Sequence, residues 1–154
     1  METAFGPVEK ADTQELTAEI ETVSRNPVVT GLLHSTGGLL AVLDEHRQVV
    51  ALNHSLLELL GIQDASQALG LRLGEALECV HAHDAPGHTC GSTRYCSTCG
   101  AAMAIITSLG QDVVAERICA LSARKGGRAI ELALLVRSQP IRLAEKRFLL
   151  IFLQ

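Results

Sequence analysis

The chain has 154 residues, of which 47% are hydrophobic, and this length and composition suit one domain with a hydrophobic core. A net charge of −4 argues against nucleic-acid binding through a bulk positive field, and an aromatic content of 3% with no Trp argues against base-stacking surfaces. No apolar run approaches the length of a membrane span, and the first ten residues lack the apolar region of a secretion signal. We therefore expect a soluble, cytoplasmic domain that binds neither nucleic acid nor a membrane.

Two helices are predicted at the start of the chain, after a loose tail at residues 1–10. Residues 12–15 have the pattern of a capping box, in which an Asp side chain and a Glu three positions later satisfy the first free backbone amides. The helix that follows, to about residue 25, has an apolar stripe made of Leu16, Ile20 and Val23. Asn26 and Pro27 then predict a second, short helix to about residue 34, because Asn is a favoured N-cap and Pro fits the first helical position.

A β-hairpin and short helices are predicted next. Two apolar runs of strand length, 39–43 and 48–52, flank a short polar turn and predict an antiparallel pair. Asn53 can cap a helix that carries four leucines, and Gly61 is expected to end that helix. A further helical piece is predicted over 65–69.

The last third of the chain predicts a helix and three strands. An apolar segment at 101–109 predicts a buried helix that Gly110 ends. The strands are predicted over 113–121, 128–138 and 148–153, with a turn over 124–127. Because every position of the last strand is apolar, we expect that strand to be central and covered on both faces. Helices that follow the hairpin would cover one face of the sheet, and the stripe of the N-terminal helix or a partner subunit is expected to cover the other.

The order of these elements resembles the PAS sensor fold over residues 26–154. The resemblance is carried by the paired runs at 39–44 and 49–53, by the segment 59–61, and by the turn at 125–128. It implies an α+β fold, in which a five-stranded antiparallel sheet has helices on one face and an additional N-terminal helix. It also implies sensing or dimerisation, with residues 1–25 as a tail and an amphipathic helix used for dimerisation and signalling.

Five cysteines need a chemical explanation in a chain expected to lie in a reducing compartment. Four of them, with the spacing C-x10-C-x5-C-x2-C, are Cys79, Cys90, Cys96 and Cys99. A C-x-x-C pair lets two thiolates reach one metal ion, and two more soft ligands complete a tetrahedral or cluster site. Their His, Asp, Gly, Ser and Thr neighbours are too polar for a hydrophobic core. We therefore predict that the four cysteines hold one metal centre, with Cys99 beside a helix start whose partial positive charge favours the thiolate.

The fifth cysteine, Cys119, lies on a predicted strand away from this cluster in the sequence. A buried cysteine commonly acts as a small hydrophobic side chain. We therefore expect Cys119 to pack in the core, and we expect Cys119→Ser to leave the metal centre in place.

The cysteine-rich insertion at 79–99 resembles a cysteine-bearing subset of PAS domains found in bacterial sensor kinases. Iron–sulfur is favoured over zinc, because structural zinc usually has two tight ligand pairs and only one is present, and because zinc has no redox change to report. The histidines of the polar loop, His81, His83 and His88, are alternative ligands. A zinc-stiffened interaction module and a thiol redox protein that uses Cys96 and Cys99 are the other hypotheses.

The predicted function is therefore that of a sensory domain. It would bind an iron–sulfur cluster and report redox state or oxygen to an output domain, such as a histidine kinase, elsewhere in the full-length protein. We expect no enzymatic activity in this chain, because it has neither phosphoacceptor nor ATP-site motifs. We expect a homodimer formed through the N-terminal helix and the outer face of the sheet.

Overall fold

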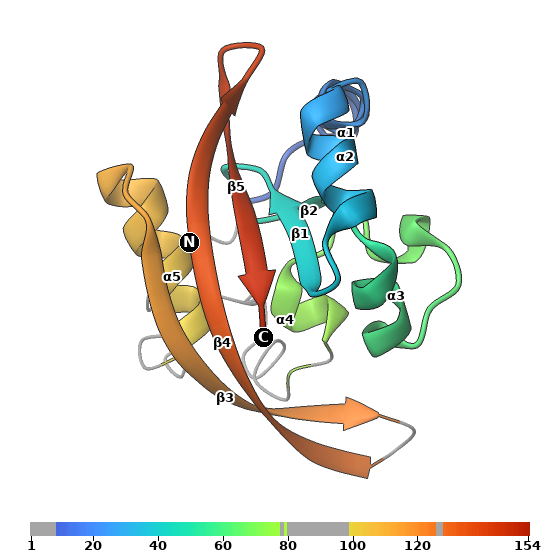
Figure 1. Ribbon diagram of the computed structural model, residues 1–154, viewed down its shortest axis with the longest axis vertical. Helices are drawn as coiled ribbons and strands as arrows, with labels where there is room; N and C mark the ends of the chain where they lie inside the picture. The colour runs from blue at the N-terminus through green and yellow to red at the C-terminus, as the bar shows by residue number, and fades with distance from the viewer. Residues whose placement is uncertain (1–8, 78, 80–98, 126–127) are drawn as a thin grey trace.

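The computed structural model describes residues 9–77, 79, 99–125 and 128–154 (Figure 1). The elements, in chain order, are α1 (Thr13–Ser24), α2 (Pro27–Ser35), β1 (Leu39–Leu43), β2 (Val49–Leu52), α3 (His54–Leu60), the 3₁₀ helix η1 (Ala65–Gln67), α4 (Leu73–Ala76), α5 (Gly100–Gln111), β3 (Ala115–Lys125), β4 (Arg128–Leu143) and β5 (Lys146–Leu153). The strands form one five-stranded antiparallel sheet with the order β2-β1-β5-β4-β3, so the predicted α+β class is confirmed. No helix in these ranges is long and apolar enough to cross a membrane.

Side-chain caps start the helices at the predicted positions. Asp12 Oδ1 accepts the backbone N–H of Glu15 at 2.8 Å at the start of α1. Asn26 Oδ1 accepts two backbone amides, at 3.1 and 3.0 Å, in the first turn of α2. Asn53 caps α3 and also ties that helix to the sheet, because its Oδ1 accepts the backbone N–H of Leu40 at 3.2 Å and its Nδ2 donates to the backbone oxygen of Gly38 at 2.7 Å. These caps satisfy backbone groups that a helix end leaves unpaired.

The last strand is central, as its composition predicts. β5 pairs with β1 on one side and with β4 on the other. β3 runs over 115–125 where 113–121 is predicted, and its ladder with β4 continues to the pair of Lys125 and Arg128. β4 continues past its predicted end at residue 138 to Leu143 and pairs there with β5. The expected turn over 124–127 is therefore wrong at its first two positions, which pair in the ladder despite their polar side chains, and residues 126–127 lie outside the described part.

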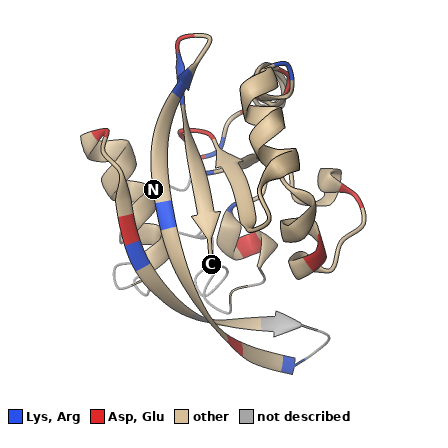
Figure 2. Ribbon diagram, viewed as in Figure 1, with Lys and Arg blue, Asp and Glu red and all other residues tan. Residues whose placement is uncertain are grey.

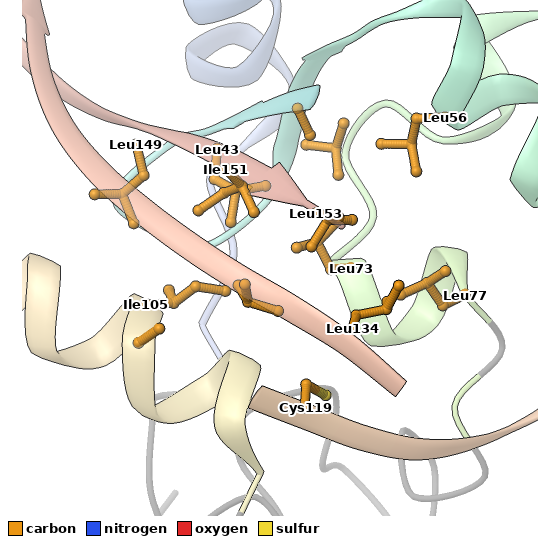
Figure 3. Packing of buried hydrophobic residues seen from close by; sticks show 14 of the residues in the cluster. Leu43, Leu56, Leu73, Leu77, Ile105, Cys119, Leu134, Leu149, Ile151 and Leu153 are labelled. Carbon is orange, nitrogen blue, oxygen red and sulfur yellow. The ribbon is translucent and has the colours of Figure 1, made fainter. Parts of the chain in front are cut away.

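Helices cover both faces of the sheet, and they enclose two hydrophobic clusters. On one face, α3, α4 and α5 bury an inner cluster of aliphatic side chains that includes Leu43, Leu149 and Ile151 (Figure 3). On the other face, Val23 of α1 and Val29 of α2 pack against β1, β2 and β5. The chain's own N-terminal helices, rather than a partner subunit, therefore cover this part of the outer face.

Two helical details differ from the sequence prediction. α5 continues past Gly110 to Gln111, and Asp112 with a φ of 55° ends it. An Asp tolerates this left-handed conformation because its short polar side chain can bond locally, so a glycine is not required there. The four-residue helix α4 was not predicted, since a segment this short has no readable hydrophobic period.

Candidate functional site

Cys79 is held beside strand β3. Its backbone N–H donates to the oxygen of Gly74 at 2.7 Å, which folds the chain back after α4. Cys79 also forms an isolated antiparallel bridge with Ala123 of β3. The first residue of the predicted ligand set is thus fixed to the sheet through its backbone.

Cys99 lies at the N-cap of α5, so the expectation that it stands at a helix start is confirmed. Its backbone oxygen accepts the N–H of Met103 at 2.9 Å, which begins the helical ladder. The next residue, Gly100, lies so close to β3 that a Cβ there would sit 2.0 Å from the backbone oxygen of Ile118. Only glycine permits this approach, and it brings Cys99 against the strand.

Cys119 lies on β3 directly opposite this helix start. It is fully buried in the inner cluster, so its expected place in the core is confirmed (Figure 3). Its Sγ is also 3.8 Å from the Sγ of Cys99. The hydrogen bond with Cys99 raises the pKa of the Cys119 thiol most, burial raises it further, and the charge of Cys79 adds to the rise. Cys119 is therefore beside Cys99 in space, although the two residues are 20 positions apart in the chain.

The other predicted ligands cannot be placed beside these three. Cys90, Cys96, His81, His83 and His88 all lie outside the described residues. Within 9–77, 79, 99–125 and 128–154, no group of three or more His, Cys, Asp or Glu side chains is arranged to hold a metal ion. The described part of the site is thus a cysteine pair, Cys99 and Cys119, together with Cys79, which is bridged to β3 at Ala123.

A signal for the position of Cys119 was present in the sequence. The buried residues of β3 opposite α5 are small, namely Ala115, Cys119 and Ala123, and the helix begins Gly-Ala-Ala. Small residues on both surfaces allow a helix and a strand to approach closely. This match indicates that the helix and the strand approach closely, and the tertiary structure decides that Cys119 is the residue that meets the start of α5.

Comparisons with known proteins identify the fold. No protein-family model matches the sequence, and no curated protein is similar to it. The PAS domain of nitrogen regulation protein NR(II) from Vibrio parahaemolyticus superposes with a TM-score of 0.57, at 16% identity over 81% of this chain and 94% of that one. The PAS domain of an HTR-like protein from Haloarcula marismortui gives 0.54, at 17% identity over 93% and 98%. A PAS domain from a two-component sensor histidine kinase gives 0.52, at 12% identity over 92% and 98%. The chain therefore has a PAS-like fold, as its order of elements predicts.

Proposed function

We propose that the chain is a sensory domain of a signal-transduction protein and that its cysteines hold a metal centre. The observation that carries this proposal is the convergence of Cys79 and Cys99 on β3. These residues are the two ends of the predicted ligand set, and each is anchored to the same strand, one through its bridge to Ala123 and the other through the contact of Gly100 with Ile118. A segment whose two ends lie on one strand in this way could close around one centre.

The chemistry of the donor set favours a thiophilic metal. Thiolates are the ligands of zinc and of iron–sulfur clusters, and Cys79, Cys90, Cys96 and Cys99 would hold the centre. The start of α5 has no acidic residue in its first turn, so its partial positive charge favours thiolates and an anionic cluster. We favour an iron–sulfur cluster, which would supply a redox- or oxygen-sensitive group, and we keep zinc as the alternative.

A centre held by these cysteines would be able to act on the rest of the domain. Cys99 begins α5, and Cys79 pairs with β3, which is an edge strand of the sheet. A change in the centre would shift the contact between α5 and β3, and the strands β4 and β5 would carry that shift across the sheet. The receiver of the signal would be an output domain such as a histidine kinase, and this chain itself would have no catalytic role.

We propose a second copy of the chain as a partner. The outer sheet face is only partly covered by α1 and α2, and on the remainder Ile118 is 74% exposed. A shallow groove beside it is lined by Glu116, Leu135, Arg137, Phe152 and Gln154. Figure 2 shows charged residues on β3 and β4 in this region, where Arg137 pairs with Glu116 at 3.4 Å, and apolar side chains such as Ile118 and Leu135 lie beside that pair. A surface that combines an exposed apolar side chain with an ion pair suits a symmetric homodimer.

Light scattering on the purified chain tests the dimer. Ile118→Asp should shift the mass from that of a dimer to that of a monomer, because a charge would be buried at the interface. Glu45→Gln, on an exposed turn outside this face, is the control and should leave the mass unchanged. A wild-type chain that is monomeric at high concentration would refute the homodimer.

Anaerobic purification with iron, sulfide and zinc assays tests the metal centre. Iron with acid-labile sulfide and a visible absorption spectrum would support the cluster. Zinc alone would replace it with the zinc-stiffened module, and a metal-free protein with a reactive thiol pair would favour thiol redox chemistry. Cys79→Ser and Cys99→Ser should each remove or destabilise the centre, because a hydroxyl is a poor ligand. Ala101→Ser adds a hydroxyl at the same helix start without removing a thiol, and it should keep the centre.

A further inference from the structure

An acid occupies part of the contact that holds helix α1 on the outer face of the sheet. The two buried side chains of α1 are Glu19 and Val23, and the other residues of its apolar stripe, Leu16 and Ile20, are only half-buried. Glu19 is 4% exposed, and it meets the fully buried Asp44 in the turn between β1 and β2. The docking of α1 therefore depends on a pair of carboxyl groups as well as on apolar contacts.

Each acid of this pair has one buried oxygen that lacks a donor. Within the described part of the chain, neither Glu19 Oε1 nor Asp44 Oδ2 has a hydrogen-bond partner, although both atoms are shielded from water. The other oxygen of Asp44 accepts the backbone amides of His46 and Gln48, each at 2.9 Å. Two ionised carboxylates here would repel each other and leave both acceptors unsatisfied. One proton shared between them removes both costs, because it makes one carboxyl group a donor.

Glu19 is the member of the pair that carries this proton. The two backbone amides favour the charged form of Asp44. Burial, followed by the hydrogen bond to Asp44 and the charge of Asp44, raises the pKa of Glu19 to about 8. The charge of Lys146, at the start of β5, opposes the rise, and the charge of Glu15, one turn earlier on α1, adds to it. The proton is therefore bound in the docked helix and is lost more easily from a loosened one.

Further charged groups lie in the same turn, namely Glu45, His46 and Arg47. Glu45 pairs with Arg147 of β5 at 3.3 Å, and Arg47 is buried. His46 Nε2 lies 3.7 Å from Glu15 Oε1, and this pair is charged only when the imidazole is protonated. The imidazole is thus a second titratable group between α1 and the turn, and a test of the acid pair needs a background without it.

The chain is anchored on both sides of α1 by contacts that do not involve the acid pair. Before the helix, the backbone oxygen of Glu9 accepts Arg72 Nη2 at 2.7 Å, and the backbone N–H of Ala11 donates to Gln48 Oε1 at 2.7 Å. After the helix, Asn26 caps α2. α1 can therefore loosen between two fixed ends while the sheet stays folded. A helix of 12 residues without its packing surface is marginal in water, so loosening would open its hydrogen bonds.

We propose that the proton shared by Glu19 and Asp44 holds α1 on the sheet, and that loss of this proton loosens the helix. Loosening would uncover the apolar side chains beneath it, which include Leu40 and Val42 of β1. An apolar residue at position 19 would hold the helix at every pH, whereas an acid makes its docking depend on protonation. The domain thus contains a pH-sensitive element that does not depend on the proposed metal centre.

Hydrogen exchange of the backbone amides between pH 5 and 8, corrected for the intrinsic exchange rate at each pH, tests the proposal on the wild-type chain. The protection of the α1 amides should fall by up to about tenfold per pH unit, because the loosened helix binds one proton fewer. It should also stay below that of the β5 amides, because a central strand opens only when the sheet unfolds. Equal protection of α1 and β5 at every pH would overturn the proposal, since α1 would then open only with the whole fold.

Four variants assign the titrating group. Glu19→Gln keeps a donor for Asp44 but has no proton to lose, so the protection of α1 should no longer depend on pH. Asp44→Asn provides a second variant, and it should flatten the profile in part, because its amide group can donate to ionised Glu19. Glu21→Gln, at an exposed position of the same helix, is the matched control and should follow the wild type. His46→Gln should also keep the pH dependence of the wild type. A profile that flattens in His46→Gln but not in Glu19→Gln would overturn the role of the acid pair.

Discussion

Glu19 gives the domain a stability that depends on pH. This residue lies on α1, is only 4% exposed, and faces the fully buried Asp44 after β1. The carboxylate of Asp44 is engaged by the turn, because its Oδ1 accepts the backbone amides of His46 and Gln48, both at 2.9 Å. Burial, followed by the hydrogen bond to Asp44 and the charge of Asp44, raises the pKa of Glu19 from 4.5 to about 8, although the charge of Lys146 opposes the rise.

The sign of the effect follows from the direction of this shift. The folded chain holds the Glu19 proton more tightly than the unfolded chain, so this stability is fully present below pH 4.5 and is lost as the pH rises toward about 8. Each pKa unit corresponds to about 1.4 kcal/mol, so the difference between 4.5 and about 8 limits the loss of folding stability to the order of 5 kcal/mol. Glu19→Gln keeps the size of the side chain and can still donate to Asp44, but it has no proton to lose. The variant should therefore be more stable than the wild type at pH 8 by a few kcal/mol, as the shift in the Glu19 pKa implies.

Urea unfolding followed by circular dichroism between pH 5 and 8.5 measures this difference. The free energy of unfolding of the wild type should fall across the range by up to about 1.4 kcal/mol per pH unit, and that of Glu19→Gln should fall less. Glu21→Gln is the matched control, because Glu21 lies on the same helix and is exposed, and it should follow the wild type. Parallel pH profiles for the wild type and Glu19→Gln would refute the protonated Glu19.

Three further perturbations test the packing that surrounds the site. Gly100→Ala should destabilise the fold by about 3 kcal/mol or more in urea unfolding, because the new Cβ would lie 2.0 Å from the backbone oxygen of Ile118. Gly110→Ala on the same helix is the control: its Cβ would meet nothing within 4 Å, so it should be neutral or stabilising. Asn53→Ala should cost about 2–4 kcal/mol in the same assay, because it removes the cap of α3 and leaves buried backbone groups of the sheet unpaired; a loss under about 1 kcal/mol would contradict this role. Deleting residues 1–25 should uncover the outer hydrophobic cluster and cause aggregation or dye binding, and a well-behaved truncated chain of equal stability would refute the covering role of α1.

The sequence by itself determined the elements whose signals are local. Asn26-Pro27 and the pair Asn53 and Gly61 mark helix ends because their preferences act within a few residues of the backbone. The unbroken apolar segment of β5 predicted a central strand, since only a strand covered on both faces can bury every side chain. The spacing of the cysteines between 79 and 99 likewise predicts a metal centre, because ligand reach within a short segment depends on local chain length.

Only the tertiary structure decided which distant groups meet. The approach of α5 to β3 depends on Gly100, on the small buried residues of the strand, and on the β4 ladder that holds Cys119 in place. In the sequence alone, Cys119 has the pattern of an ordinary core residue, and Glu19 that of an ordinary helix-surface acid. The pair Cys99 and Cys119, and the pair Glu19 and Asp44, arise from contacts between elements far apart in the chain. Such contacts reflect the packing of whole surfaces rather than any local preference, so residue spacing carries no direct record of them.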